Sequence, residues 1–295
     1  MNQLAAPLIS VVMPVYNVER YVGSAIESIL DQTCGDFEFI IVCDAPTDAS
    51  LDVVRGYVDP RIKVVEHPHN RGISAALNTG LEHASGRFVA RMDSDDLSMP
   101  ARFEKQLEVL QSDPGIAMCG TLAKLIDEND REVGEFNAPL GAAMAAFYWR
   151  PSPILHPSAM FPNPRGAWRY SEIYRWAQDY SIFLLLGKSG RLHNLPESLV
   201  RYRRHSSAAG VHRQTEQEDE CHAIFQERSG FALPRAAYGA LLKWNYTVPA
   251  GERHRWMRRV AAEFCGRYGY LHLLDDLRYA RRRLGRRRSG RRGKA

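Results

Sequence analysis

Residues 8–30 read LISVVMPVYNVERYVGSAIESIL, and this stretch shows how the chain begins to fold. Leu8–Val15 is a continuous apolar run rich in β-branched residues, which is typical of a strand buried on both faces of a sheet. From Tyr21 to Leu30 the apolar residues recur at helical spacing. The stretch therefore predicts one strand followed by one helix.

The same alternation continues along the first 200 residues. Strand-like runs recur at 37–43, 62–66, 87–92, 116–126 and 199–202. Helical spacing recurs at 51–57, 73–83, 100–113 and 177–186. Residues 128–149 have no clear type and connect to a further segment at 156–161. Strands that alternate with helices indicate an α/β fold, with a mostly parallel central sheet flanked by helices. In such sheets ligands bind beyond the carboxyl ends of the strands.

Composition excludes several classes of protein. The chain has 295 residues, of which 45% are hydrophobic and 25% charged, so most of it is not disordered. Its apolar runs are much shorter than the roughly 18 to 20 residues that span a bilayer, and no secretion signal is evident at the start. Five cysteines without a C-x-x-C pair predict reduced thiols. We expect a cytoplasmic protein.

Charge is distributed unevenly along the chain. The net charge is +5, but residues 252–295 hold 15 Lys and Arg against 4 Asp and Glu, which is +11 and leaves −6 for the rest. We therefore predict a body at 1–210 and a helical, Arg-rich extension at 211–295. A basic segment of this kind suits an anionic partner such as a lipid surface or a nucleic acid.

The sharpest local signal is Asp93-Ser94-Asp95-Asp96, which comes directly after the run at 87–92. Three carboxylates in four residues repel one another unless a cation neutralises them. Carboxylate oxygens suit Mg²⁺ or Mn²⁺. The alternative is an acidic turn that caps the next helix, and the motif by itself leaves both readings open.

Several motifs occur together in a characteristic order. They are residues 9–17 (ISVVMPVYN), 44–48 (DAPTD), 70–72 (NRG), 93–96 (DSDD), 156–161 (HPSAMF), 178–180 (QDY) and 202–205 (YRRH). Over residues 8–207 the chain strongly resembles the family 2 glycosyltransferases with the GT-A fold. The resemblance implies a Rossmann-like sheet, with a half that binds the nucleotide sugar at about 1–100 and an acceptor half at about 101–210. It also implies a divalent cation that bridges the diphosphate and the acidic motif, and inversion at the anomeric carbon.

The resemblance assigns five residues to the nucleotide donor: Pro14, Tyr16, Asp44, Arg71 and Asp93. An aromatic ring at Tyr16 can stack on the base, although it can equally be a core residue. Asp44 would accept a hydrogen bond from the base, or cap a helix, although Asp48 is the better candidate for a cap. Arg71 would bring positive charge near the phosphates or lie in solvent. Here Ala45-Pro46 replaces the usual Gly-Ser, which leaves the identity of the base open.

The resemblance assigns Asp95 to the metal, with His205 as a further metal or diphosphate contact unless that histidine is structural. An inverting reaction needs a base opposite the departing diphosphate. Asp179 matches the residue that bears this role, although Gln178 stands where a Glu is common and an Asp at a helix start is also favoured by the helix dipole.

Two residues are assigned to the acceptor side, His156 and Trp176. Aromatic faces suit the C–H surfaces of sugars, but the aromatic cluster at 168–176 can equally belong to the core. Acceptor loops vary most in such folds, so the sequence does not name the acceptor.

Beyond residue 252 apolar residues at helical spacing alternate with arginines. Basic amphipathic helices lie at membrane surfaces, which would place the protein peripherally on the cytoplasmic face of the membrane, near lipid-linked acceptors. The alternative is a helix packed on the body with a solvated end.

The sequence therefore predicts an inverting, metal-dependent glycosyltransferase of cell-surface polysaccharide synthesis with a UDP-sugar donor. A sugar-phosphate nucleotidylyltransferase is a rival, but it requires a glycine-rich phosphate loop that residues 13–17 lack. A non-catalytic protein that binds nucleic acid or another anionic surface is a second rival, which the acidic body disfavours.

Overall fold

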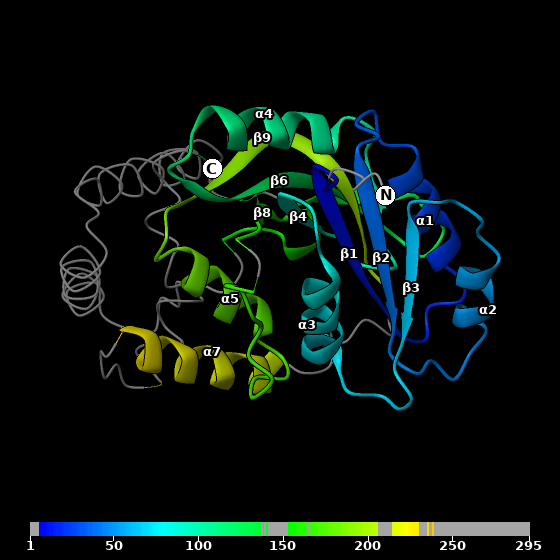
Figure 1. The fold of residues 1–295 in the computed structure, drawn as a ribbon. Coiled ribbons are helices and arrows are strands. Elements are labelled where there is room, and N and C mark those ends of the chain that lie inside the picture. Colours follow the sequence, from blue (N-terminus) through cyan, green and yellow to red (C-terminus); the bar gives the residue numbers. More distant parts are fainter. Residues whose placement is uncertain are drawn as a thin grey trace, which may run out of the picture.

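The computed structural model describes residues 6–136, 138, 140, 153–164, 166–205, 214–229, 235 and 238. Its first half contains the predicted alternation of strands and helices (Figure 1). The elements are β1 (Ile9–Val15), α1 (Val22–Leu30), β2 (Phe37–Cys43), α2 (Ser50–Arg55), β3 (Ile62–Glu66), α3 (Ile73–His83) and β4 (Phe88–Arg91).

The second half is less regular. It contains β5 (Leu97–Ser98), α4 (Arg102–Ser112), β6 (Ile116–Ile126), β7 (Glu132–Phe136), the short 3₁₀ helix η2 (His156–Ser158), β8 (Met160–Pro162), α5 (Gln178–Leu186), β9 (Arg191–Arg203) and α7 (Gln214–Ser229). The β9 strand begins well before the predicted run at 199–202. Its first part is polar and contains Pro196, so it lacks the apolar pattern of a strand.

One nine-stranded sheet runs in the order β3-β2-β1-β4-β8-β6-β9-β5, and β7 pairs with β6. Strands β3, β2, β1 and β4 are parallel, and β6 is parallel to β9. The pairs β4–β8, β6–β8, β5–β9 and β6–β7 are antiparallel. The sheet curls, so that β5 at one end of it contacts α1, which packs beside β1 and β2. There the Ser98 N–H donates to Ser28 Oγ at 3.0 Å. The predicted α/β class is confirmed.

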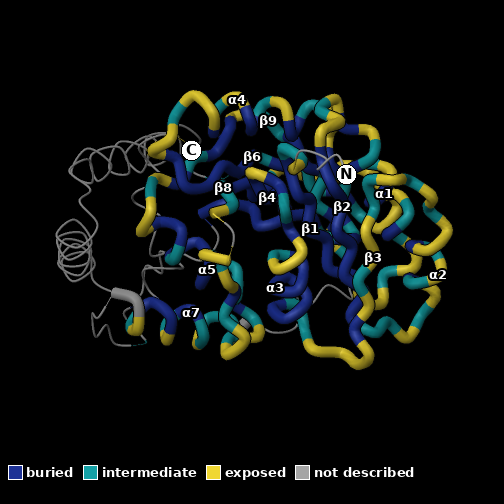
Figure 2. Tube along the Cα trace, viewed as in Figure 1, coloured by how far each residue is buried: buried dark blue, intermediate teal, exposed yellow. Residues whose placement is uncertain are grey.

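Helices cover both faces of the sheet (Figure 1). Val11 and Met13 of β1 pack with residues of α1, α2 and α4 in one hydrophobic cluster. Val12, between them, packs with residues of α3, α5 and α7 in the other. Figure 2 shows the buried residues concentrated in the strands between these two helical layers. The continuous apolar run of β1 follows from this burial on both sides.

The extension predicted from residue 211 lies mostly outside the described residues. Its described helix, α7, packs against α5, and Ile224 and Phe225 are buried in the same cluster as Phe183. Within the described part of the chain no helix is long and apolar enough to cross a membrane. The described cysteines, Cys34, Cys43, Cys119 and Cys221, are free thiols, as predicted.

Candidate active site

The carboxyl ends of β1, β2 and β4 lie at one edge of the sheet. Val15 pairs with Cys43, and Val12 pairs with Arg91, so the loops that follow these strands begin side by side. These loops carry Tyr16, Asp44 and the acidic motif Asp93–Asp96. The edge at which a parallel sheet binds ligands therefore gathers the predicted donor and metal residues.

The acidic motif forms a tight cluster of oxygens. Asp93, Asp95 and Asp96 each place one carboxylate oxygen within 4.8 Å of the others. Burial raises the pKa of Asp93 and raises the pKa of Asp96 well above its usual range, and neighbouring carboxylates add to both shifts. Asp96 is fully buried, and its Oδ2 atom has no hydrogen-bond partner among the described residues. Three clustered carboxylates and an unpartnered buried oxygen fit a divalent cation such as Mg²⁺ or Mn²⁺.

Two basic side chains contact this cluster. Arg91, at the end of β4, is buried and forms an ion pair with Asp93. His205, which follows β9, places Nε2 at 2.9 Å from Asp95 Oδ2. The structure thus brings His205 to the predicted metal ligand, and its own role as a ligand stays a prediction.

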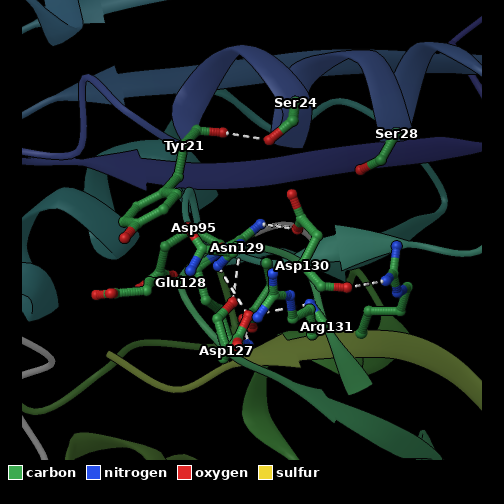
Figure 3. A network of polar contacts seen from close by, with 12 residues as sticks. Tyr21, Ser24, Ser28, Asp95, Asp127, Glu128, Asn129, Asp130 and Arg131 are labelled. Atoms are coloured by element: carbon green, nitrogen blue, oxygen red, sulfur yellow. Dashed lines mark hydrogen bonds and ion pairs between the residues drawn. The ribbon is translucent and has the colours of Figure 1, made fainter. Parts of the chain in front are cut away.

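Arg203, the last residue of β9, holds the backbone of the acidic motif. Its N–H donates to Asp96 Oδ1 and its Nε donates to the carbonyl of Asp95, both at 2.7 Å. Its Nη1 donates to the carbonyl of Asp127 at 3.1 Å, and its Nη2 lies 2.7 Å from Asp130 Oδ1. Figure 3 shows Asp95 beside the turn at 127–131, which connects β6 to β7. The buried guanidinium therefore fixes the acidic loop to this turn.

Asp44 is engaged inside the protein. Its Oδ1 accepts from the N–H of Arg71 at 2.9 Å, and its Oδ2 accepts from the N–H of Gly72 at 2.8 Å, at the start of α3. His67 Nδ1 lies 2.6 Å from Asp44 Oδ1. The carboxylate therefore accepts hydrogen bonds from backbone N–H groups at the N-terminus of α3. Its contact with the nucleobase of a donor stays a prediction. Asp48 accepts from the N–H of Ser50 at the start of α2.

Ala45, which directly follows Asp44, has a φ of 50°. L-residues other than Gly, Asn and Asp rarely adopt this left-handed conformation. The backbone here requires the conformation that a glycine would adopt without strain, so this loop keeps its shape at an energetic cost.

The other donor-side residues lie around the same edge. Pro14 is buried in β1, whereas Tyr16 directly beyond it is 47% exposed. The exposed ring of Tyr16 is available to a ligand, and this exposure excludes the alternative of a core residue. Arg71 is also exposed, at the start of α3.

His156, which is predicted to lie on the acceptor side, contacts Tyr170. His156 Nε2 lies 2.9 Å from the Tyr170 hydroxyl, and both residues are buried. Burial raises the pKa of Tyr170, Arg91 opposes the rise, and the charges of Asp179 and Asp93 add to it. Burial, reinforced by Arg91, lowers the pKa of His156 well below its usual range, so this histidine is neutral at neutral pH. The charges of Asp179 and Asp93 thus both act on the Tyr170 hydroxyl.

Trp176 and Asp179 lie at the beginning of α5. The guanidinium carbon of Arg175 is 5.2 Å from the centre of the Trp176 ring, which is partly buried. Asp179 lies in the first turn of α5, and its Oδ1 accepts from the N–H of Tyr180 at 2.7 Å.

Known proteins are similar to this chain in sequence and in architecture. The sequence profile described as glycosyl transferase family 2 matches residues 10–165, more than half of the chain. The chain belongs to glycosyl transferase family 2. EpsE of Bacillus subtilis, named as a glycosyltransferase, is 31% identical over 269 residues, which is 86% of this chain and 95% of EpsE. WfgD of Escherichia coli is 35% identical over 132 residues, 45% of this chain and 51% of WfgD, and is named a UDP-Glc:alpha-D-GlcNAc-diphosphoundecaprenol beta-1,3-glucosyltransferase.

Solved structures share the GT-A fold of this family 2 glycosyltransferase. TarS of Staphylococcus aureus, in complex with UDP-GlcNAc, gives a TM-score of 0.64 at 17% identity, over 87% of this chain and 80% of TarS. The mannosyltransferase PcManGT of Pyrobaculum calidifontis, in complex with GDP-Man and Mn²⁺, gives 0.60 at 17% identity, over 95% of this chain and 81% of that protein. At these identities the likeness shows the fold alone.

Sequence reasoning missed four residues that support the site of this glycosyltransferase: His67, Arg91, Arg203 and Glu220. The last of these, in α7, accepts from the N–H groups of Trp176 and Ala177 ahead of α5. Arg91 was detectable, since an arginine in the otherwise apolar run at 87–92 requires a buried partner. The partners of the other three lie far away in the sequence, so no local pattern reveals them.

Proposed function

We propose that this family 2 glycosyltransferase is an inverting enzyme of bacterial cell-surface polysaccharide synthesis. It transfers a sugar from a UDP-sugar to a hydroxyl of a saccharide or lipid-linked acceptor. The observation that carries the proposal is the carboxylate cluster with the unpartnered Asp96 oxygen, at the ligand-binding edge of the sheet. A UDP-sugar donor is supported by the name of WfgD, which specifies UDP-Glc, and by the complex of TarS with UDP-GlcNAc. The name of WfgD also specifies a lipid-linked acceptor, which supports that class of acceptor here.

The acidic cluster would hold a divalent cation, with Asp95 as the main ligand and His205 as a further contact. The Mn²⁺ in the PcManGT complex supports this assignment. When bound, the cation supplies positive charge that stabilises the diphosphate leaving group. Tyr16 stacks on the base, Asp93 contacts the ribose or the metal shell, and Arg71 adds positive charge near the phosphates.

Asp179 is the general base in this proposal. Inversion requires a proton acceptor on the side of the sugar opposite the diphosphate, and such a group contributes about 10²- to 10⁴-fold to the rate. The position of Asp179 in the first turn of α5 supports this role, because its charge, like that of Asp93, raises the pKa of Tyr170. His156 and Trp176 line the acceptor side.

The organisation of the chain belongs to the same proposal. Residues 1–210 form the GT-A domain, with the donor half at about 1–100 and the acceptor half at about 101–210, and residues 211–295 form the extension. The enzyme is cytoplasmic and contacts the membrane surface through its basic tail.

The first test measures thermal unfolding with UDP and UDP-sugars, with and without Mn²⁺. A ligand at about 100 times its Kd stabilises the native state by about 2.7 kcal/mol, which raises Tm by about 5 to 10 °C in a domain of this size. Asp95→Ala should abolish the part of the shift that needs Mn²⁺. Asp113→Ala, which removes an exposed carboxylate paired with Arg191, is the matched control and should keep the full shift.

Asp179→Ala separates binding from chemistry. The variant should keep the Mn²⁺-dependent shift with UDP and lose sugar transfer, because the base acts only in the reaction. Normal transfer by Asp179→Ala would refute the base, and an unchanged shift in Asp95→Ala would refute the metal site.

A further inference from the structure

Helix α7 supplies an unexpected cap to the start of α5. Glu220 of α7 accepts hydrogen bonds from three successive backbone N–H groups: Arg175 at 3.0 Å to Oε1, and Trp176 at 2.6 Å and Ala177 at 2.9 Å to Oε2. Arg175 and Trp176 directly precede the helix, and only the N–H of Ala177 belongs to the helix end, where N–H groups have no partner within the helix and a carboxylate is favoured. The N-cap residue of α5 is Ala177, whose side chain cannot do this. A residue about 43 positions later in the chain performs the capping.

The capped segment leads directly to the candidate base. Asp179 follows Ala177 by two residues, and it lies in the first turn of α5. Its position is therefore set by where that turn begins. Burial raises the pKa of Cys221, the neighbour of Glu220, and the charges of Asp179 and Glu220 add to the rise. The candidate base and the capping carboxylate thus lie close to the same thiol.

The rest of α5 is held by other contacts. Tyr180, Ile182, Phe183 and Leu186 are each no more than 1% exposed, and they pack in the cluster that includes Ile224 and Phe225 of α7. A second carboxylate of α7, Glu227, accepts from the Tyr174 hydroxyl at 2.6 Å. Loss of Glu220 would therefore shift the first turn of α5 without unfolding the helix.

We propose that Glu220 is a positioning residue that holds Asp179 in the geometry for proton abstraction, an inference that rests on the proposed function of Asp179. The helix at 214–229 then carries one residue that supports the reaction, Glu220, although it lies beyond the motifs of the family. A displacement of about 1 Å at a reacting group can lower a rate by about 10²-fold. Loss of the carboxylate should accordingly affect turnover much more than ligand binding.

The experiment is a double-mutant cycle on the full chain, with Mn²⁺ and a panel of UDP-glucose, UDP-galactose and UDP-N-acetylglucosamine. Release of UDP from the panel member with the highest turnover, with water as the acceptor of the sugar, gives kcat and KM. Glu220→Ala should lower kcat at least 10-fold, with KM and the Mn²⁺-dependent shift by UDP unchanged. In an Asp179→Asn background, Glu220→Ala should cause no further loss, because the two residues act as one unit.

Controls separate this inference from the proposed function. Glu227→Gln removes the other carboxylate contact from α7 and should keep kcat, whereas Glu220→Asp should recover part of the activity lost in Glu220→Ala. Three outcomes would overturn the inference while Asp179→Asn keeps its own loss of about 10²- to 10⁴-fold, which leaves a residual rate to measure: wild-type kcat in Glu220→Ala, an equal further loss in the Asp179→Asn background, or a weaker response to UDP. Full turnover in Asp179→Asn would instead overturn the base assignment, and the role of Glu220 with it.

Discussion

Ala45 shows how one residue can keep a loop in place at a cost. It directly follows Asp44, whose carboxylate accepts from the Arg71 N–H at the start of α3. It precedes Asp48, which accepts from the Ser50 N–H at the start of α2. The left-handed φ of 50° at this point lets the chain turn from β2 toward α2. The family pattern has a glycine here, and the structure gives the physical reason for it, since glycine adopts such a φ without steric strain.

Replacement of this alanine should stabilise the protein. We expect Ala45→Gly to raise the free energy of unfolding by about 0.5 to 1 kcal/mol, because relief of left-handed strain exceeds the added entropy of the unfolded chain. Urea denaturation measures the change. Ala223→Gly is the control: Ala223 is exposed in the interior of helix α7 and has no left-handed strain to relieve, so the change should lower stability by about 1 kcal/mol. Equal changes in both variants would contradict the explanation.

The residues of the candidate site differ in how well sequence predicts them. Asp93, Asp95 and Asp96 were recognisable in the sequence, because three carboxylates in one short loop repel one another unless a cation neutralises them. Arg203 was not, because its bonds to Asp95 and Asp127 join loops that meet only in the fold. Long-range side-chain contacts of this kind leave no periodic pattern in a sequence.

At the scale of elements, Glu38 joins the strands of the parallel half. This buried side chain of β2 accepts from Ser10 Oγ of β1 at 2.6 Å and from Lys63 Nζ of β3 at 2.5 Å. It also accepts from the N–H of Ser85 at 2.7 Å, ahead of β4. Burial acts against its charge, but Lys63, Ser10 and Ser85 outweigh it and lower the pKa of Glu38 to about 2.

Glu38→Gln should therefore destabilise the sheet in a pH-dependent way. A carboxyl whose pKa falls from 4.5 to about 2 on folding contributes about 3 kcal/mol above pH 4.5, and this contribution is lost as the pH falls toward 2. We expect a stability loss of about 2 to 3 kcal/mol at pH 7 that shrinks at pH 3. Urea denaturation at both pH values measures it. Glu66→Gln removes an exposed pair with Arg55 in the same layer and should change stability by less than about 1 kcal/mol.

The elements themselves followed the sequence where apolar periodicity is strong. The predicted runs at 37–43, 62–66, 73–83 and 116–126 are β2, β3, α3 and β6. The edge strand β7 was not predicted, because most of its residues are exposed and its pattern is not apolar. In β9 the register shifts around residues 195–200, where Pro196 interrupts the ladder, and this irregularity hid its first part.

At the scale of the whole molecule, charge separates the chain into an acidic body and a basic tail. Residues 281–295 alone contain nine Lys and Arg and no Asp or Glu. Each cation near an anionic bilayer contributes about 1 kcal/mol of attraction. Deletion of 281–295 should therefore abolish most sedimentation with vesicles that contain phosphatidylglycerol, and 0.5 M salt should have the same effect on the full chain. Unchanged sedimentation of the deletion variant would reject the tail as the anchor.

The path of the chain from β4 to β5 restricts how this enzyme can be re-engineered. The acidic loop begins after β4, in the parallel half of the sheet, and ends at β5, which pairs with β9 in the other half. No single recombination breakpoint separates the halves, since one after residue 100 leaves β5 paired with a foreign β9. A chimera that imports the acceptor preference of a relative must therefore transplant residues 93–98 together with β9, as one inseparable cassette.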